Sequence, residues 1–339
     1  MLRSFKIPLL ALLFWGTLAL QASPQVQNLT AVQRTDSSKK VDIYYKLVHD
    51  KPVTISIYAS QDNGATWNLP ITQISGDFGP GIDPGNGKHI IWNAMAEHPN
   101  IIFDSVKFKV VADDGVVDLT TGLIAYYPFN GNAYDMSGNG NNGSVVGATL
   151  SEDRFGNPDS AYYFDGNDYI NIGQLPQLQG AQGITVSCWI YRTSSNRTEG
   201  FVGKWYTSPQ TNNVFLLYNG EGDYKNKGAF TVQYANAYNA TTGMQGTSTM
   251  PQHQWIHLVG TWNGADGVSK IYKNGVLDNS SVKIESMNHT IYYNTSYPAM
   301  IGNWGYLWGS NYYMIGYIDD VRIYNRALTD AEVSHLYDN

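Results

Sequence analysis

The sequence predicts an all-β protein in two parts: a small β-sandwich, then a larger antiparallel two-sheet unit with one short C-terminal helix. The composition favours strands and tight turns, with 34 Gly and 25 Tyr but only 14% charged residues. Short runs that alternate apolar and polar residues are separated by turns rich in Gly, Asn and Asp, as is typical of strands joined by hairpins. A chain of 339 residues is also long enough for two domains.

Residues 1–22 have the pattern of a secretory signal peptide. Arg3 and Lys6 precede an apolar run at 7–20 that is short for a membrane span, and small residues end the segment at Ala22. We predict cleavage after Ala22, with an uncleaved anchor as the alternative. The mature chain is therefore expected to be secreted, either extracellular or associated with the cell surface, with no membrane insertion after signal cleavage.

The charge balance and the cysteine count narrow the possible partners and chemistry. The formal net charge is −7, without clusters of basic residues, which argues against nucleic acid and against anionic membrane surfaces. The single cysteine, Cys188, lies in the strand-like run TVSCWIY at 185–191, where a buried core residue is expected. A disulfide within the chain is excluded because there is no second cysteine.

Residues 23–115 predict the small β-sandwich. Alternating runs that read as strands lie at 41–48, 53–59, 88–92 and 106–112. The stretch SQDNGATW at 60–67 predicts a structural hairpin: Asp62 caps turn amides and Gly64 takes a positive φ, while Trp67 packs beneath. This part of the chain resembles immunoglobulin- or fibronectin type III-like modules attached to secreted bacterial proteins, which have about seven strands.

Residues 116–339 carry a series of motifs that together indicate the second unit. They are GLIAYYPFNGNAYDMSGNGNNG at 122–143, YYFDGNDYINI at 162–172, WIHLVGTW at 255–262, KIYKNGVL at 270–277 and GYIDDVRIYNRAL at 316–328. In this order they resemble the LamG-like jellyroll family of the concanavalin A-like lectin/glucanase superfold. The resemblance implies two packed antiparallel sheets and a calcium ion beside the DMSGNG loop.

Local signals agree with that architecture. Asn274-Gly275 is a strong two-residue hairpin signal. Alternation from Trp255 places Trp255, His257, Val259 and Thr261 on one face of a strand. Thr329 begins a capping box with Glu332, which predicts the terminal helix. Its apolar residues Ala331, Val333 and Leu336 are expected to close one end of the sandwich.

The closing strand contains a carboxylate in an unusual position. Regular alternation places Asp319 on the same side as Val321 and Ile323, which predicts a core-facing carboxylate. An ionised carboxylate there requires pairing, hydrogen bonds or a metal. Asp320 is expected on the opposite face, so that Asp319 and Asp320 cannot act as a catalytic pair.

The loop DMSGNG at 135–140 predicts a calcium site. Asp135, Ser137 and Asn139 offer oxygen-bearing side chains at the first, third and fifth positions, as at the opening of a calcium loop. An EF-hand is excluded because Val146 stands at the position of its bidentate Glu. The predicted ligands are Asp135, Ser137, Asn139, Asn141 and Asp319, and the role of Ca²⁺ is structural. The alternative is a turn in which Asp135 caps backbone amides.

No catalytic residues are predicted. Closely spaced carboxylates of the E-x-D-x-x-E kind are absent from the sequence, and the histidines form no H-x-H or H-E-x-x-H group. The aromatic stretch at 303–313 is a candidate ligand-binding loop through Trp304, Tyr306, Trp308 and Tyr312. The alternative is that these rings cover the core.

The sequence thus predicts a secreted, non-catalytic binding or adhesion protein that recognises a glycan or an extracellular protein. Two other functions remain open. One is a glycan-active hydrolase or an accessory subunit of one, and the other is a structural envelope or matrix component without a small ligand.

Overall fold

The computed structural model describes residues 23–99, 105–194, 197–206, 213–220, 225–235, 240–304 and 312–339. Contacts divide the chain into two units, one ending at Val116 and one beginning at Val117, while the sequence placed the boundary after residue 115. Both units are built almost entirely of antiparallel strands, as predicted. The predicted signal peptide lies outside the described residues. Within the described ranges, no helix is long and apolar enough to cross a membrane.

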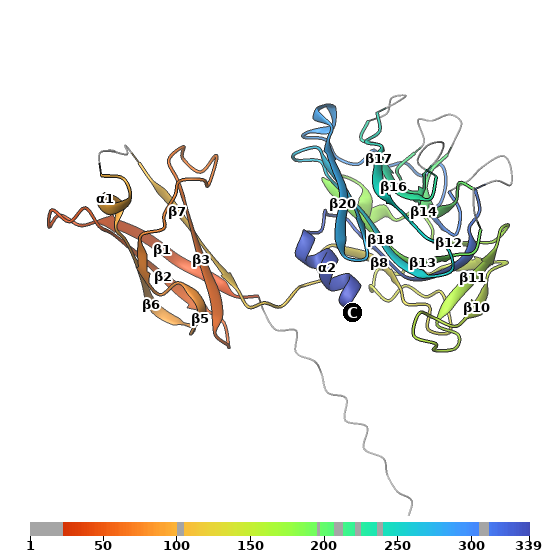
Figure 1. Ribbon diagram of the computed structural model, residues 1–339, viewed down its shortest axis with the longest axis horizontal. Helices are drawn as coiled ribbons and strands as arrows, with labels where there is room; N and C mark the ends of the chain where they lie inside the picture. Colours follow the sequence, from red (N-terminus) through yellow and green to blue (C-terminus); the bar gives the residue numbers. More distant parts are fainter. Residues whose placement is uncertain are drawn as a thin grey trace, which may run out of the picture. The chain divides into compact units, whose positions relative to one another are not determined.

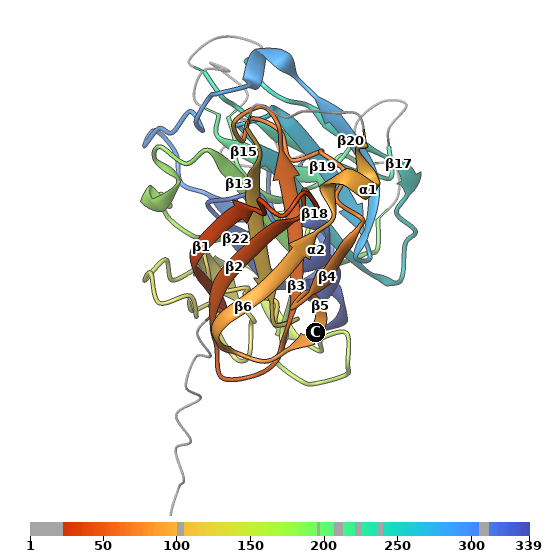
Figure 2. The ribbon, with the colours of Figure 1, turned by 90° about the vertical axis from the view of Figure 1, so that its left-hand side faces the viewer.

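The first unit is a sandwich of two sheets. One sheet has the order β1-β2-β6-β4 and the other β5-β3-β7, and Figure 2 shows β1, β2 and β6 side by side. Its elements are β1 (Gln25–Gln33), β2 (Val41–Val48), β3 (Val53–Ser60), β4 (Ile74–Gly76), β5 (Gly79–Ile82), β6 (Gly85–Trp92), α1 (Ala94–Glu97) and β7 (Lys107–Asp113). The core between the sheets includes Ile43, Ile55 and Trp92. The immunoglobulin or fibronectin relationship stays a prediction.

The hairpin predicted at SQDNGATW is confirmed. The Asp62 carboxylate accepts hydrogen bonds from the backbone and hydroxyl of Thr66 at 2.8 and 2.6 Å. Gly64 has a φ of +94°, and a side chain at this position would meet the ring of Trp67. These bonds are all local, so this segment acts as a turn within the first unit.

The second unit is a jellyroll of two facing sheets (Figure 1). The larger sheet contains β8 (Leu123–Tyr127), β10 (Thr149–Ser151), β11 (Ala161–Asp165), β13 (Gly183–Arg192), β18 (Trp255–Asn263), β19 (Val268–Lys273), β20 (Val276–Val282) and β22 (Ile315–Tyr324). The smaller sheet contains β9 (Ser144–Val146), β12 (Tyr169–Asn171), β14 (Gly200–Lys204), β15 (Phe215–Asn219), β16 (Lys227–Val232), β17 (Met244–Thr249) and β21 (Met300–Ile301). Among the described residues, the connections contain the short 3-10 helices Pro176–Leu178 and Ile284–Ser286.

The main core fills the space between these two sheets. It includes Val186, Cys188 and Ile190 of β13, Ile256 and Leu258 of β18, and Phe215 and Leu217 of β15. Cys188 is buried, as predicted. Asn274 and Gly275 both have positive φ between β19 and β20, which confirms the predicted hairpin. We call the side of the larger sheet that points away from this core its outer face.

The terminal helix α2 (Asp330–Asp338) forms as predicted but lies elsewhere. Thr329 and Glu332 make the complete capping box. Val333 and Leu336 pack with Val259 and Tyr324 on the outer face of the larger sheet, whereas the sequence suggested that they close an end of the sandwich. Ala331 is exposed.

The prediction that Asp319 faces the core is wrong, because β22 contains a β-bulge. Ser187 pairs with Arg322 but Trp189 pairs with Asp319, so β22 has one extra residue there, and Asp320 has a φ of +46°. Ile318 and Val321 both lie in the core on either side of the bulge. Asp319 therefore points to the outer face of the larger sheet. Regular alternation without a bulge would have placed Asp320 on that face instead.

Candidate functional site

Four aromatic side chains form a row across the outer face of the larger sheet, which we call the aromatic row. The antiparallel register aligns Tyr163 of β11 with Tyr317 of β22, Tyr317 with Tyr191 of β13, and Tyr191 with Trp255 of β18. Neighbouring ring centroids lie 5.1, 5.5 and 5.8 Å apart. All four side chains are partly exposed. With strands about 4.8 Å apart, the row spans roughly 14 Å.

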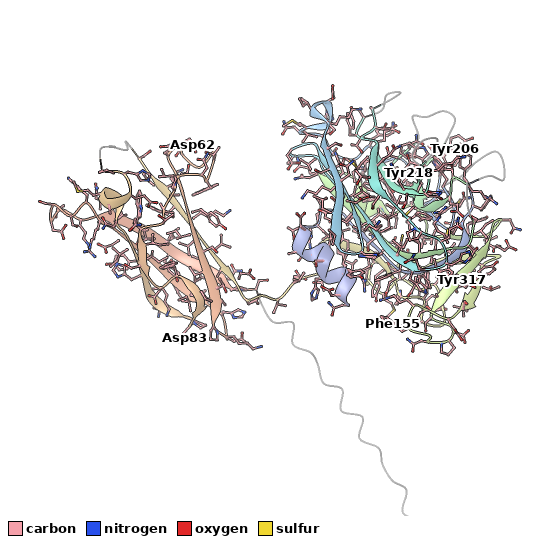
Figure 3. The ribbon with its side chains drawn as sticks, in the orientation of Figure 1. Asp62, Asp83, Phe155, Tyr206, Tyr218 and Tyr317 are labelled. Carbon is pink, nitrogen blue, oxygen red and sulfur yellow. The ribbon has the colours of Figure 1, made fainter. Side chains whose placement is uncertain are left out.

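A cleft of about 560 Å³ opens over this row. Three rings of the row form part of its lining, namely Tyr191, Trp255 and Tyr317. The remaining lining residues are Ser151, Glu152, Asp153, Pro158, Asp159, Thr193 and His253. Figure 3 labels Tyr317 of β22 and, in the connection that follows β10, Phe155, both in the second unit. The cleft thus combines aromatic rings with hydroxyl and carboxylate groups.

The connection 151–159 forms one wall of the cleft, and its own hydrogen bonds shape it. The Asp153 carboxylate accepts from the backbone N–H of Phe155 at 2.8 Å and of Asn157 at 2.9 Å. The backbone of Ser160 donates to Ser151 at 2.9 Å, which closes the base of the loop. We call this segment the wall loop.

Arg154 fastens the wall loop to β22. Its Nη1 donates to Asp319 and to Asp320, both at 2.7 Å. The guanidinium also stacks over the Trp189 ring at 4.6 Å and the Phe155 ring at 4.4 Å. The sequence prediction that Asp319 and Asp320 point to opposite faces is therefore wrong, since the bulge brings both carboxylates to one nitrogen. That the two carboxylates do not act as a catalytic pair stays a prediction.

Burial of this acidic pair changes the chemistry of Asp319. Only 2% of Asp319 is exposed. Burial is the main cause that raises the pKa of Asp319 to about 7, and the neighbouring carboxylate of Asp320 is the second cause. The Arg154 guanidinium opposes this shift. Asp320 is also held by the Tyr126 hydroxyl at 3.1 Å and lies 3.6 Å from Arg322.

Next to the aromatic row, the outer face is covered. Asp319, Trp189 and His257 are register partners that form the adjacent row. Trp189 stacks on His257 at 5.2 Å and on Tyr337 of α2 at 5.5 Å. Arg154 and α2 thus cover this second row, whereas the aromatic row borders the open cleft.

The predicted calcium ligands lie in two separate places. Asp135 Oδ1 accepts backbone N–H groups of Tyr126 and Ser137 at 3.0 and 2.9 Å, and Oδ2 accepts that of Asn141 at 2.9 Å. Asp319 instead holds Arg154. Tyr126 lies between the two sites, because its N–H contacts Asp135 and its hydroxyl contacts Asp320. The residues therefore do not fit one ion bridging the loop and β22.

The loop 135–141 retains a set of oxygen atoms suited to calcium. The amide nitrogens of Asn139 and Asn141 donate to backbone carbonyls at 3.1 and 2.8 Å. No hydrogen bond to their side-chain oxygens is found among the described residues, and Asp135 Oδ2 accepts a single N–H. Within the described ranges, no group of three or more His, Cys, Asp or Glu residues forms a metal cluster.

The predicted aromatic loop is only partly described. Trp304 is 8% exposed and packs against Tyr218 and Tyr312, with centroids 4.9 and 4.5 Å away. This packing is that of a ring covering the interior. Tyr306 and Trp308 lie outside the described residues, so ligand binding by this loop stays a prediction.

Sequence reasoning missed the aromatic row. Its four residues lie in stretches that were interpreted only as strands of the fold. Alternation placed Trp255 on one face of its strand but did not indicate whether that face is exposed to solvent. Alignment of the four rings depends on the pairing of strands that are far apart in sequence, which no local pattern specifies. The cleft itself depends on the wall loop and its arginine anchor.

A family comparison decides the assignment of the second unit. The family model described as the concanavalin A-like lectin/glucanases superfamily matches residues 164–334. The chain belongs to this superfamily. The match confirms the predicted jellyroll relationship, and the second unit is hereafter called the lectin/glucanase-like domain.

Similar solved structures include three from different sources. Domain 4 of AbnA, an extracellular arabinanase from Geobacillus stearothermophilus solved with arabinotriose, is 22% identical over 63% of this chain and 98% of its own, with a TM-score of 0.46. An SAP-like pentraxin from Limulus polyphemus is 20% identical over 46% and 70%, with a TM-score of 0.37. The binding domain of botulinum neurotoxin DC, solved with SialylT, is 16% identical over 65% and 52%, with a TM-score of 0.46. No curated protein matched the chain.

Proposed function

We propose that this protein is a secreted, non-catalytic carbohydrate-binding protein whose lectin/glucanase-like domain holds an oligosaccharide on the aromatic row. The observation that carries the proposal is the alignment of Tyr163, Tyr317, Tyr191 and Trp255 beside an open cleft. The apolar face of a sugar ring stacks on such rings, and neighbouring hydroxyl groups hydrogen-bond to polar side chains. The N-terminal pattern at 1–22 supports export, and on this basis we expect the ligand outside the cell or at its surface.

The position of the row on strands favours a binding role. Rings held by a sheet keep their spacing, so little conformational entropy is lost when a ligand is bound. A row of roughly 14 Å offers room for several successive sugar rings. The preferred ligand is therefore an oligosaccharide or a polysaccharide chain.

A glycan array tests this function. The wild-type protein is expected to bind a restricted set of oligosaccharides, and Trp255→Ala is expected to lose most of that signal. Tyr134→Ala is a matched control, because Tyr134 is 60% exposed and lies outside the aromatic row. Absence of binding to any glycan, or equal signals from wild type and Trp255→Ala, contradicts the proposal.

The alternative of a glycan hydrolase is supported by the acidic pair beside the row. Retaining glycosidases need two carboxyl groups at short separation, one with a raised pKa. Here, however, the Arg154 guanidinium occupies the position between Asp319 and Asp320. Release of reducing ends from a bound glycan by the wild type, lost in Asp319→Asn, would establish this alternative in place of the non-catalytic role.

We further propose that a structural calcium ion binds the loop 135–141 alone. Asp135, Asn139 and Asn141 offer the hard oxygen donors that Ca²⁺ prefers. Asp319, paired with Arg154, is left out of this set. The ion would fasten the loop and supply no chemistry to the cleft.

A further inference from the structure

The charges around the cleft are strongly unequal. Glu152, Asp153 and Asp159 of the wall loop line it, and among the lining residues that the structure describes only His253 can carry a positive charge. Arg154 belongs to the same loop, but Asp319 and Asp320 bind its guanidinium at 2.7 Å. The wall loop therefore presents carboxylates to the cleft, while its one arginine, Arg154, is paired with Asp319 and Asp320 of β22.

Two of these carboxylates are available to a ligand. The Asp153 side chain is used within the loop, where it accepts from Phe155 and Asn157. Glu152 and Asp159 are exposed, and within the described ranges no hydrogen bond to either carboxylate is found. They can accept charge-assisted hydrogen bonds from a cation placed over the aromatic row.

We propose that the cleft selects amino-sugar oligomers whose nitrogen is a free ammonium group. This inference rests on the proposed carbohydrate function and specifies its ligand class. The apolar face of a hexosamine ring stacks on the aromatic row, and its ammonium group pairs with Glu152 or Asp159 and is attracted by the ring faces. A uronate or sulfated sugar would place a negative charge beside the three carboxylates, so it is selected against.

Calorimetry with three oligomers of equal length tests the selectivity: a glucosamine oligomer, its fully N-acetylated form and a galacturonate oligomer. The titrations are made at about pH 6, where the free amines carry charge to a large extent. The glucosamine oligomer is expected to bind at least about tenfold more tightly than the N-acetylated form. Binding of the galacturonate oligomer is expected to be the weakest.

Charge variants locate the effect. Glu152→Gln/Asp159→Asn is expected to abolish the preference for the free amine, so that the amine and N-acetylated oligomers bind the variant with equal affinity. Asp83→Asn/Glu285→Gln is a matched control, since it removes the same charges at exposed positions outside the cleft. This control is expected to keep the preference.

The outcomes separate the two proposals. Equal affinity for the amine and N-acetylated oligomers overturns the amino-sugar inference and leaves carbohydrate binding standing. An equal loss of preference in the control overturns the inference as well, because net charge would then explain it. Absence of binding by all oligomers and by a wider glycan array overturns the proposed function itself.

Discussion

The environment of Asp319 makes ionisation of its carboxyl group unfavourable. This group is buried beside a second carboxylate and is balanced by one guanidinium. Its pKa is about 7 in the folded protein, against about 4 for an unfolded chain. Between these values the folded state binds a proton that the unfolded state has released.

This difference predicts the direction of a pH effect. Because the folded-state pKa is raised, the stability contributed by the Asp319 proton is fully present below about pH 4 and is lost as the pH rises to about 7. Asp319→Asn removes this dependence. Thermal unfolding of both proteins across this range should therefore show the wild type losing stability relative to the variant as pH increases.

The control for this measurement is Asp83→Asn, an exposed residue of the first unit. It should leave the pH dependence of the wild type in place. If the stability of the wild type and of Asp319→Asn depended on pH in the same way, the pKa of Asp319 would not be raised in the folded protein.

At the scale of elements, the wall loop depends on a single arginine. Removing Arg154 leaves Asp319 and Asp320 facing each other without their shared cation, and uncovers Trp189. Breaking a buried ion pair in this way costs about 3 kcal/mol. Arg154→Ala is therefore expected to lower the free energy of unfolding of the lectin/glucanase-like domain by about this amount, measured by denaturant titration.

Hydrogen exchange locates this effect in the wall loop. Amides of Phe155 and Asn157, which donate to Asp153, should exchange faster in Arg154→Ala, and glycan affinity should fall as the wall loosens. Arg154→Ala/Asp319→Asn should recover part of the stability, because one stranded carboxylate is gone. Unchanged exchange in 151–160 would mean that the loop holds its shape without the arginine.

The loop 135–141 is the second element with a predicted role. A calcium ion bound to the folded state only would stabilise it by mass action. We expect a chelator to lower the melting temperature of the wild type and to have no effect on Asp135→Ala. A melting temperature of the wild type that does not change with chelator would contradict calcium binding. Asp135 would then only cap three backbone amides.

Across the whole molecule, the fold could be predicted because its signals are local. Asn274-Gly275, the Thr329 capping box and the alternation of β18 each determine an element by short-range sterics or hydrogen bonds. The placement of α2 against Val259 and Tyr324 depends on tertiary packing, and the sequence alone put its apolar residues elsewhere.

The site was harder to predict, since it depends on one inserted residue and on long-range register. The bulge at Asp320 reverses the face of Asp319, and regular alternation contains no sign of it. The aromatic row requires four strands to align residues from Tyr163 to Tyr317. Such pairings are properties of the assembled sheet.

The central claim is that the aromatic row binds carbohydrate, and a calorimetric titration tests it most directly. The strongest ligand from the glycan array is titrated into wild type, Tyr317→Ala and Tyr134→Ala, after thermal unfolding has shown that each variant is folded. We predict that Tyr317→Ala weakens binding by about 2 kcal/mol, roughly thirtyfold, and that Tyr134→Ala binds as the wild type does. Equal affinity of Tyr317→Ala and wild type would contradict the account.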